Sequence, residues 1–137
     1  MPIHGVPLLE YWLSALKFCK YGRVYVNSHF HAEIVAEYLS RKQFGSWVEN
    51  LYERDLLGTA ATIRKNKDIF ANMPLLLIHS DNWTGADISS FVRFSKKQNT
   101  DEIFLSMLTF KTSRPELCGV VKINDAGLVT SFDEKSV

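Results

Sequence analysis

The feature that most constrains the fold of this chain is the apolar run at residues 73–79, MPLLLIH, which is followed by Ser80, Asp81 and Asn82. A short strand that is apolar on both faces is typical of the centre of a parallel sheet covered by helices. The chain has 137 residues, the length of one domain. We therefore expect residues 73–79 to form the central strand of a single α/β domain.

Helical and strand-like segments alternate on both sides of this run. Apolar residues recur at three- and four-residue steps in four segments, which predicts helices at 7–21, 32–42, 57–70 and 88–97. Runs rich in β-branched and aromatic residues predict strands at 23–27, 48–53, 102–110, 119–124 and 128–132. The last two strands flank Asn124-Asp125-Ala126-Gly127, a good hairpin signal. This order predicts a three-layer α/β fold with a mostly parallel sheet and a C-terminal antiparallel hairpin.

Composition and charge exclude several classes of protein. A hydrophobic fraction of 46% and a charged fraction of 23% are ordinary globular values. Sixteen basic against fifteen acidic residues leave a net charge of +1, so no overall field attracts nucleic acid or anionic lipid. No apolar run is long enough to span a membrane, the N-terminus lacks a signal pattern, and Cys19 and Cys118 have no second pair. We expect a cytoplasmic protein with two reduced thiols.

Polar residues follow three of the predicted strands, where α/β folds bind their ligands. These are Asn27-Ser28-His29, Glu53 with the glycine turn at Gly58, and Ser80-Asp81-Asn82. A carboxylate at Asp81, leaving a buried strand, suits a hard cation such as Mg²⁺. A turn or capping aspartate explains Asp81 equally well. A receiver-like phosphoacceptor is disfavoured, because no acidic pair lies near the end of the first strand.

The segment from Glu53 to Thr59 allows two readings. Gly58 lets the backbone approach a ligand, and the helix that begins there presents free N–H groups, although a glycine turn capped by Thr59 is the simpler explanation. Glu53 suits the adjacent N–H donors of guanine, or is an exposed turn glutamate. His29 and His31 have the spacing of a metal pair, but no Asp, Glu or Cys except Glu33 lies at a matching distance, so we interpret them as structural. Dinucleotide, P-loop and serine-hydrolase motifs are absent from the sequence.

Six segments, taken in order, resemble the sugar-phosphate nucleotidyltransferase family, and within it the mannose-1-phosphate guanylyltransferase-like branch. They are GVPLLEYW at 5–12, VNSH at 26–29 with Ala32-Glu33, Glu53 with LLGTA at 56–60, Ser80-Asp81, CGVV at 118–121 and FDEK at 132–135. The resemblance spans nearly the whole chain. It implies a Rossmann-like nucleotidyltransferase fold.

The resemblance also implies an activity. A nucleotidyl group would pass from an NTP, with GTP favoured, to a sugar 1-phosphate, giving an NDP-sugar and pyrophosphate. The implied site residues are Asp81 for Mg²⁺ and catalysis, Glu53, Leu57, Gly58 and Thr59 for the nucleotide, Gly119 and Glu134 for the sugar, and Lys135 for catalysis and the sugar phosphate. The same residues would serve a non-catalytic nucleotide-sugar-binding or regulatory subunit.

The chain departs from the family pattern at three places. The family opens with a strand, a Gly-rich loop carrying an Arg and a Lys-Pro pair, whereas this chain starts downstream of them at Met1. The family's second metal-binding aspartate would follow Val137, and His79 stands where a small or polar residue is usual. We therefore expect one domain, residues 1–137, that is incomplete at both ends and inactive alone. An exposed sheet edge should favour self-association as a homo-oligomer.

Overall fold

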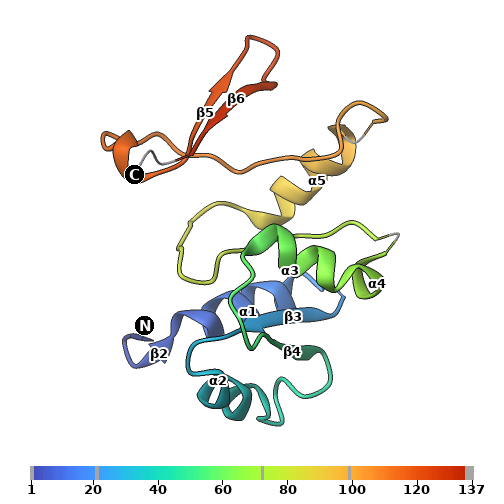
Figure 1. Ribbon diagram of the computed structural model, residues 1–137, viewed down its shortest axis with the longest axis vertical. Coiled ribbons are helices and arrows are strands. Elements are labelled where there is room, and N and C mark those ends of the chain that lie inside the picture. The colour runs from blue at the N-terminus through green and yellow to red at the C-terminus, as the bar shows by residue number, and fades with distance from the viewer. Residues whose placement is uncertain (1, 21, 72, 99, 135–137) are drawn as a thin grey trace. The chain divides into compact units, whose positions relative to one another are not determined.

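The computed structural model describes residues 2–20, 22–71, 73–98 and 100–134 (Figure 1). These fall into two compact units, Met1–Val92 and Arg93–Val137. Each of the three sheets among the described residues has two strands. No helix in these described ranges has the length and apolar character needed to cross a membrane.

A parallel strand pair forms the centre of the first unit. Strand β3 (Val24–Ser28) runs beside β4 (Val48–Tyr52), in a register that pairs Val24 with Val48 and Ser28 with Tyr52. The chain passes from one strand to the other through helix α2 (Ala32–Leu39). Parallel neighbours need such a crossover, because a tight turn cannot reverse the chain twice. The strands predicted at 23–27 and 48–53 and the helix predicted at 32–42 are therefore confirmed, each within a few residues at its ends.

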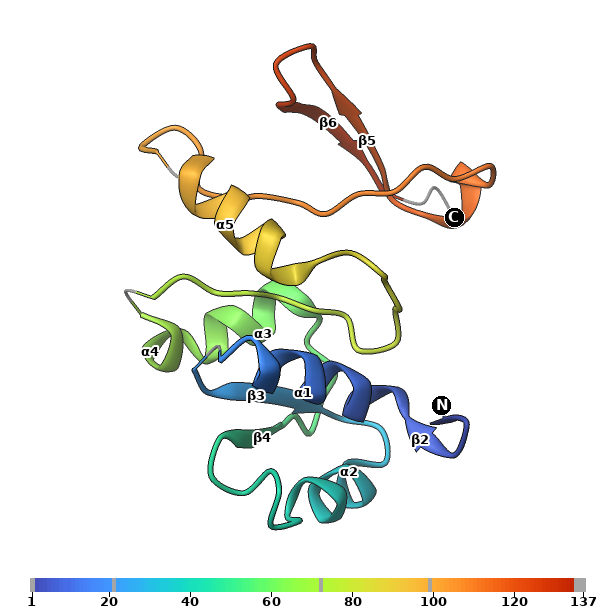
Figure 2. The ribbon, with the colours of Figure 1, turned by 180° about the vertical axis from the view of Figure 1, so that it is seen from behind.

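Helix α1 (Leu8–Phe18) packs against this strand pair, and Figure 2 shows the helix in front of β3. Its apolar stripe buries Leu8, Trp12, Leu13 and Leu16. Leu13 forms one buried cluster with Leu39, Phe44 and Val48, which joins α1 to α2 and β4. Burying each such side chain stabilises the fold by about 1.5–3 kcal/mol. Before α1, the short strands β1 (Pro2–Ile3) and β2 (Val6–Pro7) pair antiparallel.

The helix predicted over 57–70 forms in two pieces, α3 (Thr59–Lys65) and α4 (Lys67–Phe70). Asn66 breaks it, with φ −102° and ψ 23°, and its side-chain amide donates to the carbonyl of Thr62 at 2.9 Å. Asparagine side chains compete with the helix for such backbone groups. The predicted cap is also wrong: Gly58, not Thr59, occupies the N-cap position, and no side chain caps the helix.

The prediction of a central strand at residues 73–79 is wrong. The segment has no strand partner among the described residues, and the side chains of Leu75 and Leu77 are 46% and 52% exposed. A strand exists only where a neighbour accepts its ladder of hydrogen bonds, and apolar composition alone does not supply one. The described residues therefore confirm an α/β fold with one parallel pair, but not a three-layer Rossmann-like layout with a mostly parallel sheet.

A hairpin dominates the second unit. Helix α5 (Ile88–Gln98) begins in the first unit and ends in the second, and the turn η1 (Pro115–Leu117) precedes strands β5 (Val120–Ile123) and β6 (Val129–Asp133). The strands pair antiparallel, as predicted. In their turn, Asn124 Oδ1 accepts from the backbone N–H of Leu128 at 2.9 Å, and Gly127 has φ 79°. The helix predicted at 88–97 is confirmed, whereas 102–110 forms no strand.

Candidate functional site

The side chain of Glu53 is 1% exposed and lies directly after β4. Its Oε1 accepts a hydrogen bond from Thr62 Oγ1 at 2.6 Å, while Oε2 accepts from Asn27 Nδ2 at 3.3 Å and from the backbone N–H of Leu57 at 3.4 Å. These donors come from β3, from the segment before the glycine turn and from α3. One buried carboxylate thus connects three parts of the first unit.

The backbone of Glu53 is held as well. Its N–H donates to the carbonyl of Ser28 at 2.8 Å, and its own carbonyl lies 3.0 Å from His29 Nδ1. Ser28, itself buried, donates from Oγ to Asn50 Oδ1 at 2.7 Å. Hydrogen bonds therefore connect the carboxyl ends of β3 and β4. The contact of His29 with the Glu53 carbonyl is one of them, which agrees with the structural interpretation of this histidine.

Hydrogen bonding keeps Glu53 ionised. The Thr62 hydroxyl, with Asn27, the Leu57 amide and the charge of Lys65, holds the pKa of Glu53 below its ordinary value of 4.5, although burial acts in the opposite direction. A buried carboxylate that accepts several donors is stabilised in its charged form. At neutral pH the cluster is therefore an anion surrounded by donors.

Beside this buried anion lies an exposed turn. Leu57, Gly58 and Thr59 are all exposed to solvent, and Gly58 has φ 78° and ψ 163°, a backbone conformation nearly confined to glycine. A Cβ at this position would meet no atom within 4 Å, so the requirement for glycine comes from the backbone angle and not from crowding. The Gly58 carbonyl accepts from the Thr62 N–H at 2.9 Å. The turn at residues 57–59 is therefore exposed to solvent, while its backbone is held by hydrogen bonds to Glu53 and Thr62.

Asp81 has a very different environment. It lies in an exposed turn, where the N–H of Asn82 donates to the carbonyl of His79 and the Trp12 indole donates to the carbonyl of Asn82 at 2.8 Å. In the described part of the chain, the Asp81 carboxylate has no hydrogen-bond or ion-pair partner. Capping geometry belongs to a different aspartate, Asp87, whose Oδ1 accepts from the N–H of Ser90 at 3.1 Å near the start of α5.

Among the described residues, the protein offers a magnesium ion near Asp81 no cluster of carboxylate, imidazole or thiolate ligands. Magnesium takes six ligands, usually one or two carboxylates completed by water and phosphate oxygens. Among the residues that the structure describes, no three His, Cys, Asp or Glu side chains come together as metal ligands. Asp81 therefore offers one accessible carboxylate. His31, the second residue of the sequence pair, lies at the N-terminus of α2 with φ 52° and its ring against Phe30.

Three predicted residues belong to the second unit or lie outside the described residues. A Cβ on Gly119 would come within 2.8 Å of the outer edge of the Phe132 ring, so a larger residue there would require this ring to move. Glu134 is exposed just after β6, and Lys135 lies outside the described residues. Close packing against Phe132 is a structural role for Gly119.

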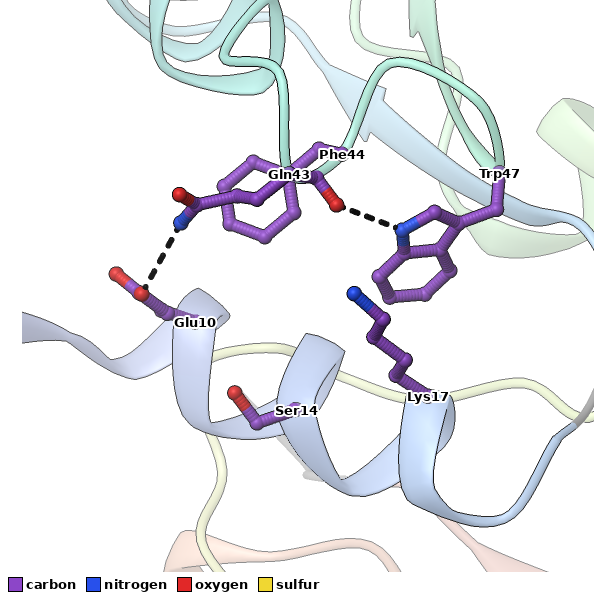
Figure 3. Close-up of a pocket in the computed structure, with 6 residues that line it drawn as sticks. All are labelled: Glu10, Ser14, Lys17, Gln43, Phe44 and Trp47. Carbon is purple, nitrogen blue, oxygen red and sulfur yellow. Dashed lines mark hydrogen bonds between the residues drawn. The ribbon is translucent and has the colours of Figure 1, made fainter.

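A shallow pocket of about 120 Å³ lies elsewhere in the first unit, between α1 and the connection from α2 to β4 (Figure 3). Its lining residues are Glu10, Ser14, Lys17, Gln43, Phe44 and Trp47. Gln43 Nε2 donates to Glu10 Oε1 at 3.4 Å, and the Trp47 indole donates to the Gln43 carbonyl at 2.9 Å. The Tyr38 hydroxyl also donates to Glu10, and burial with this contact raises the pKa of Tyr38 to about 12. The polar groups here mainly join α1 to its neighbours.

Sequence reasoning identified Glu53 and Gly58 but missed Thr62. The only signal was its position four residues after Gly58, within reach of that carbonyl, and many helical threonines share this spacing. Asn27 belonged to a flagged segment, yet nothing indicated that it reaches Glu53 across 26 residues.

The arrangement has the form of an α/β ligand-binding edge, in which an exposed glycine turn follows parallel strands at their carboxyl ends. Residues 1–136 match the family model described as nucleotidyl transferase. Because the match covers nearly the whole chain, this protein belongs to the nucleotidyl transferase family. The broader part of the sequence resemblance, a transferase of nucleotidyl groups, is thereby confirmed.

Proposed function

We propose that this chain serves sugar-1-phosphate nucleotidyl transfer, in which an NTP and a sugar 1-phosphate give an NDP-sugar and pyrophosphate. The observation that carries the proposal is the fixed, exposed turn at residues 57–59, beside the buried carboxylate of Glu53, in a chain of the nucleotidyl transferase family. Within that family we propose the guanylyltransferase-like branch, with GTP and mannose 1-phosphate as substrates. Sequence resemblance supports this finer assignment.

The nucleotide would bind at the turn. Leu57 offers a side chain that is 40% exposed, an apolar surface suited to the face of a planar base. Gly58 and Thr59 offer exposed backbone groups for its polar edge. Both features stand at the carboxyl end of the parallel pair, which supports this placement.

The remaining assignments follow the resemblance. Asp81 would contribute one carboxylate to Mg²⁺; its exposed side chain, which has no partner among the described residues, supports this role. Gly119 and Glu134 would contact the sugar, and Lys135 would pair with its phosphate.

The test measures ligand binding by the full chain from the shift in Tm that each ligand causes in thermal unfolding. GTP, the other NTPs, GDP-mannose and other NDP-sugars are compared with and without Mg²⁺. A ligand that binds only the folded state stabilises it by about 2.7 kcal/mol at a concentration 100 times its Kd. We expect GTP or GDP-mannose to raise Tm the most. No shift with any nucleotide would overturn the proposal.

A matched pair of glycine variants locates the site. Gly58 and Gly127 both have positive φ, and a Cβ at either would meet nothing within 4 Å. Gly58→Ala should weaken nucleotide binding, whereas Gly127→Ala, in the hairpin turn, should leave it unchanged. Pyrophosphate release from GTP and mannose 1-phosphate would identify a transferase and would contradict the expectation that the chain is inactive alone, whereas binding without release is the result expected of an inactive chain.

A further inference from the structure

We propose that Glu53 is a positioning residue: its buried carboxylate sets the conformation of the turn at 57–59 and does not itself read the nucleobase. The inference rests on the proposed function for what that turn binds. It differs from the direct base contact that the sequence resemblance implies for Glu53. The two roles predict different behaviour toward different bases.

Burial argues against direct contact. The Glu53 side chain is 1% exposed, and both of its oxygens already accept hydrogen bonds from the protein, at 2.6 Å on Oε1 and at 3.3 and 3.4 Å on Oε2. A base that approached this carboxylate would have to displace Asn27 or Leu57. Displacement would leave a donor without its partner, which is unfavourable.

The contacts hold the turn from both sides. Leu57 precedes Gly58 and Thr62 follows it, and both donate to the same carboxylate. The Thr62 N–H donates to the Gly58 carbonyl at 2.9 Å, and that carbonyl also lies 3.0 Å from Thr62 Oγ1, whose single hydrogen is directed to the nearer Glu53 oxygen. Glu53 is in turn anchored to β3 through Ser28. The positive φ of Gly58 is therefore imposed by a network that ends on the rigid strand pair.

Charge is essential to this arrangement. Thr62, Asn27 and the Leu57 amide all act as donors to Glu53, and an ionised carboxylate is the side chain that only accepts. Glutamine has nearly the same shape but replaces one acceptor oxygen by an NH₂ group, so either Asn27 and Leu57 lose their acceptor or the Thr62 hydroxyl must turn from residue 53 to the Gly58 carbonyl. Glu53→Gln should therefore loosen the turn without removing volume from the core.

The experiment compares Glu53→Gln with Glu49→Gln in the full chain. Glu49 lies on the same strand, has a side chain that is 45% exposed and pairs with Arg23 at the surface. Calorimetric titrations measure the Kd of GTP, ATP, UTP and CTP, and hydrogen exchange without nucleotide follows the amides of residues 54–62. We expect Glu53→Gln to weaken every NTP that binds by the same factor, about tenfold. It should also speed exchange at Leu57, and Glu49→Gln should change neither.

Two results would overturn the inference. A loss confined to one base would show that Glu53 contacts the base directly. Unchanged exchange in residues 54–62 would show that it does not set the turn. If the unaltered chain binds no nucleotide, the proposed function fails, and the exchange experiment still decides whether Glu53 holds the turn.

A second pair of variants covers the case in which Glu53→Gln does not fold. Thr62→Val removes the hydroxyl that donates at 2.6 Å while keeping the shape of the side chain, and Thr62→Ser keeps the hydroxyl. We expect Thr62→Val to reproduce the uniform loss of affinity and Thr62→Ser to restore binding. Equal nucleotide affinities in the two variants would contradict the positioning role.

Discussion

Glu53 and Asp81 each follow a segment that reads as a strand, yet the structure treats the two carboxylates in opposite ways. Glu53 is buried and accepts hydrogen bonds from β3, α3 and the segment before the glycine turn. Asp81 is exposed in a turn. The segment before Glu53 has a parallel partner in β3, whereas residues 73–79 pair with no strand in the described part of the chain. The carboxylate that is organised is the one to which a neighbouring strand, a turn and a helix all bring donors.

The difference also separates two kinds of functional site. In the Glu53 region, hydrogen bonds connect the strand ends, the turn and α3 in the absence of a ligand, which should reduce the conformational freedom lost on binding. The Asp81 region offers an accessible carboxylate but, among the described residues, no cluster of metal-coordinating side chains around it.

The largest effect is expected where the core supports the strand pair. Leu13 is 1% exposed and packs with Leu39, Phe44 and Val48. Leu13→Ala should lower the free energy of unfolding by about 2–5 kcal/mol, because it leaves a cavity beneath β4. Leu77→Ala, at a side chain that is 52% exposed, should change it by less than about 0.5 kcal/mol. Urea unfolding measures both, and equal effects would show that the two regions are packed alike.

The next effect concerns the charge of Glu53. Glu53→Gln should cost about 1–3 kcal/mol at pH 7, because a buried donor loses its acceptor. The folded-state pKa lies below the ordinary value of 4.5, so the contribution of Glu53 is present above that pH and is lost as pH falls through the folded-state pKa. The stability difference between wild type and variant should therefore shrink below pH 4.5. A difference that stays constant as the solution is acidified would contradict an ionised Glu53.

A pair of glycines, one in each region, gives a smaller effect. Gly58→Ala should destabilise the fold by about 1–2 kcal/mol, because alanine is strained at φ 78°. Gly85, near Asp81, has no positive φ and open space around it. Gly85→Ala should therefore be neutral within about 0.5 kcal/mol. Thermal unfolding of both variants checks this, and a tolerant Gly58 would mean that its turn is free to rearrange.

The sequence predicted well those elements whose stability is local or rests on a neighbour close in sequence. Helix α1 follows from its apolar period, the hairpin from the turn at Asn124 to Gly127, and the β3–β4 pair from one short crossover. Residues 73–79 and 102–110 were predicted from composition alone. A strand also needs a partner, and composition does not say where that partner is.

The candidate site was predictable to a similar extent. Glu53 and Gly58 were visible as residues at a strand end and in a turn. The burial of Glu53 was not visible, because it depends on Asn27 and Thr62, which reach the carboxylate from other elements. The donors around a carboxylate depend on how distant elements pack together, and the local sequence does not show this packing.

The smallest effect on stability is expected at Asp81, where function and fold separate most clearly. Asp81→Asn removes a charge that has no hydrogen-bond or ion-pair partner among the described residues, so unfolding should change by less than about 0.5 kcal/mol. If Asp81 serves a cation, the same variant should abolish any gain in NDP-sugar binding that Mg²⁺ gives the wild type. Asp125→Asn, at an exposed aspartate in the hairpin turn, is the control and should keep that gain. A Mg²⁺-dependent gain that survives in Asp81→Asn would make Asp81 a turn residue and leave Glu53 as the only one of the two carboxylates with a role in the site.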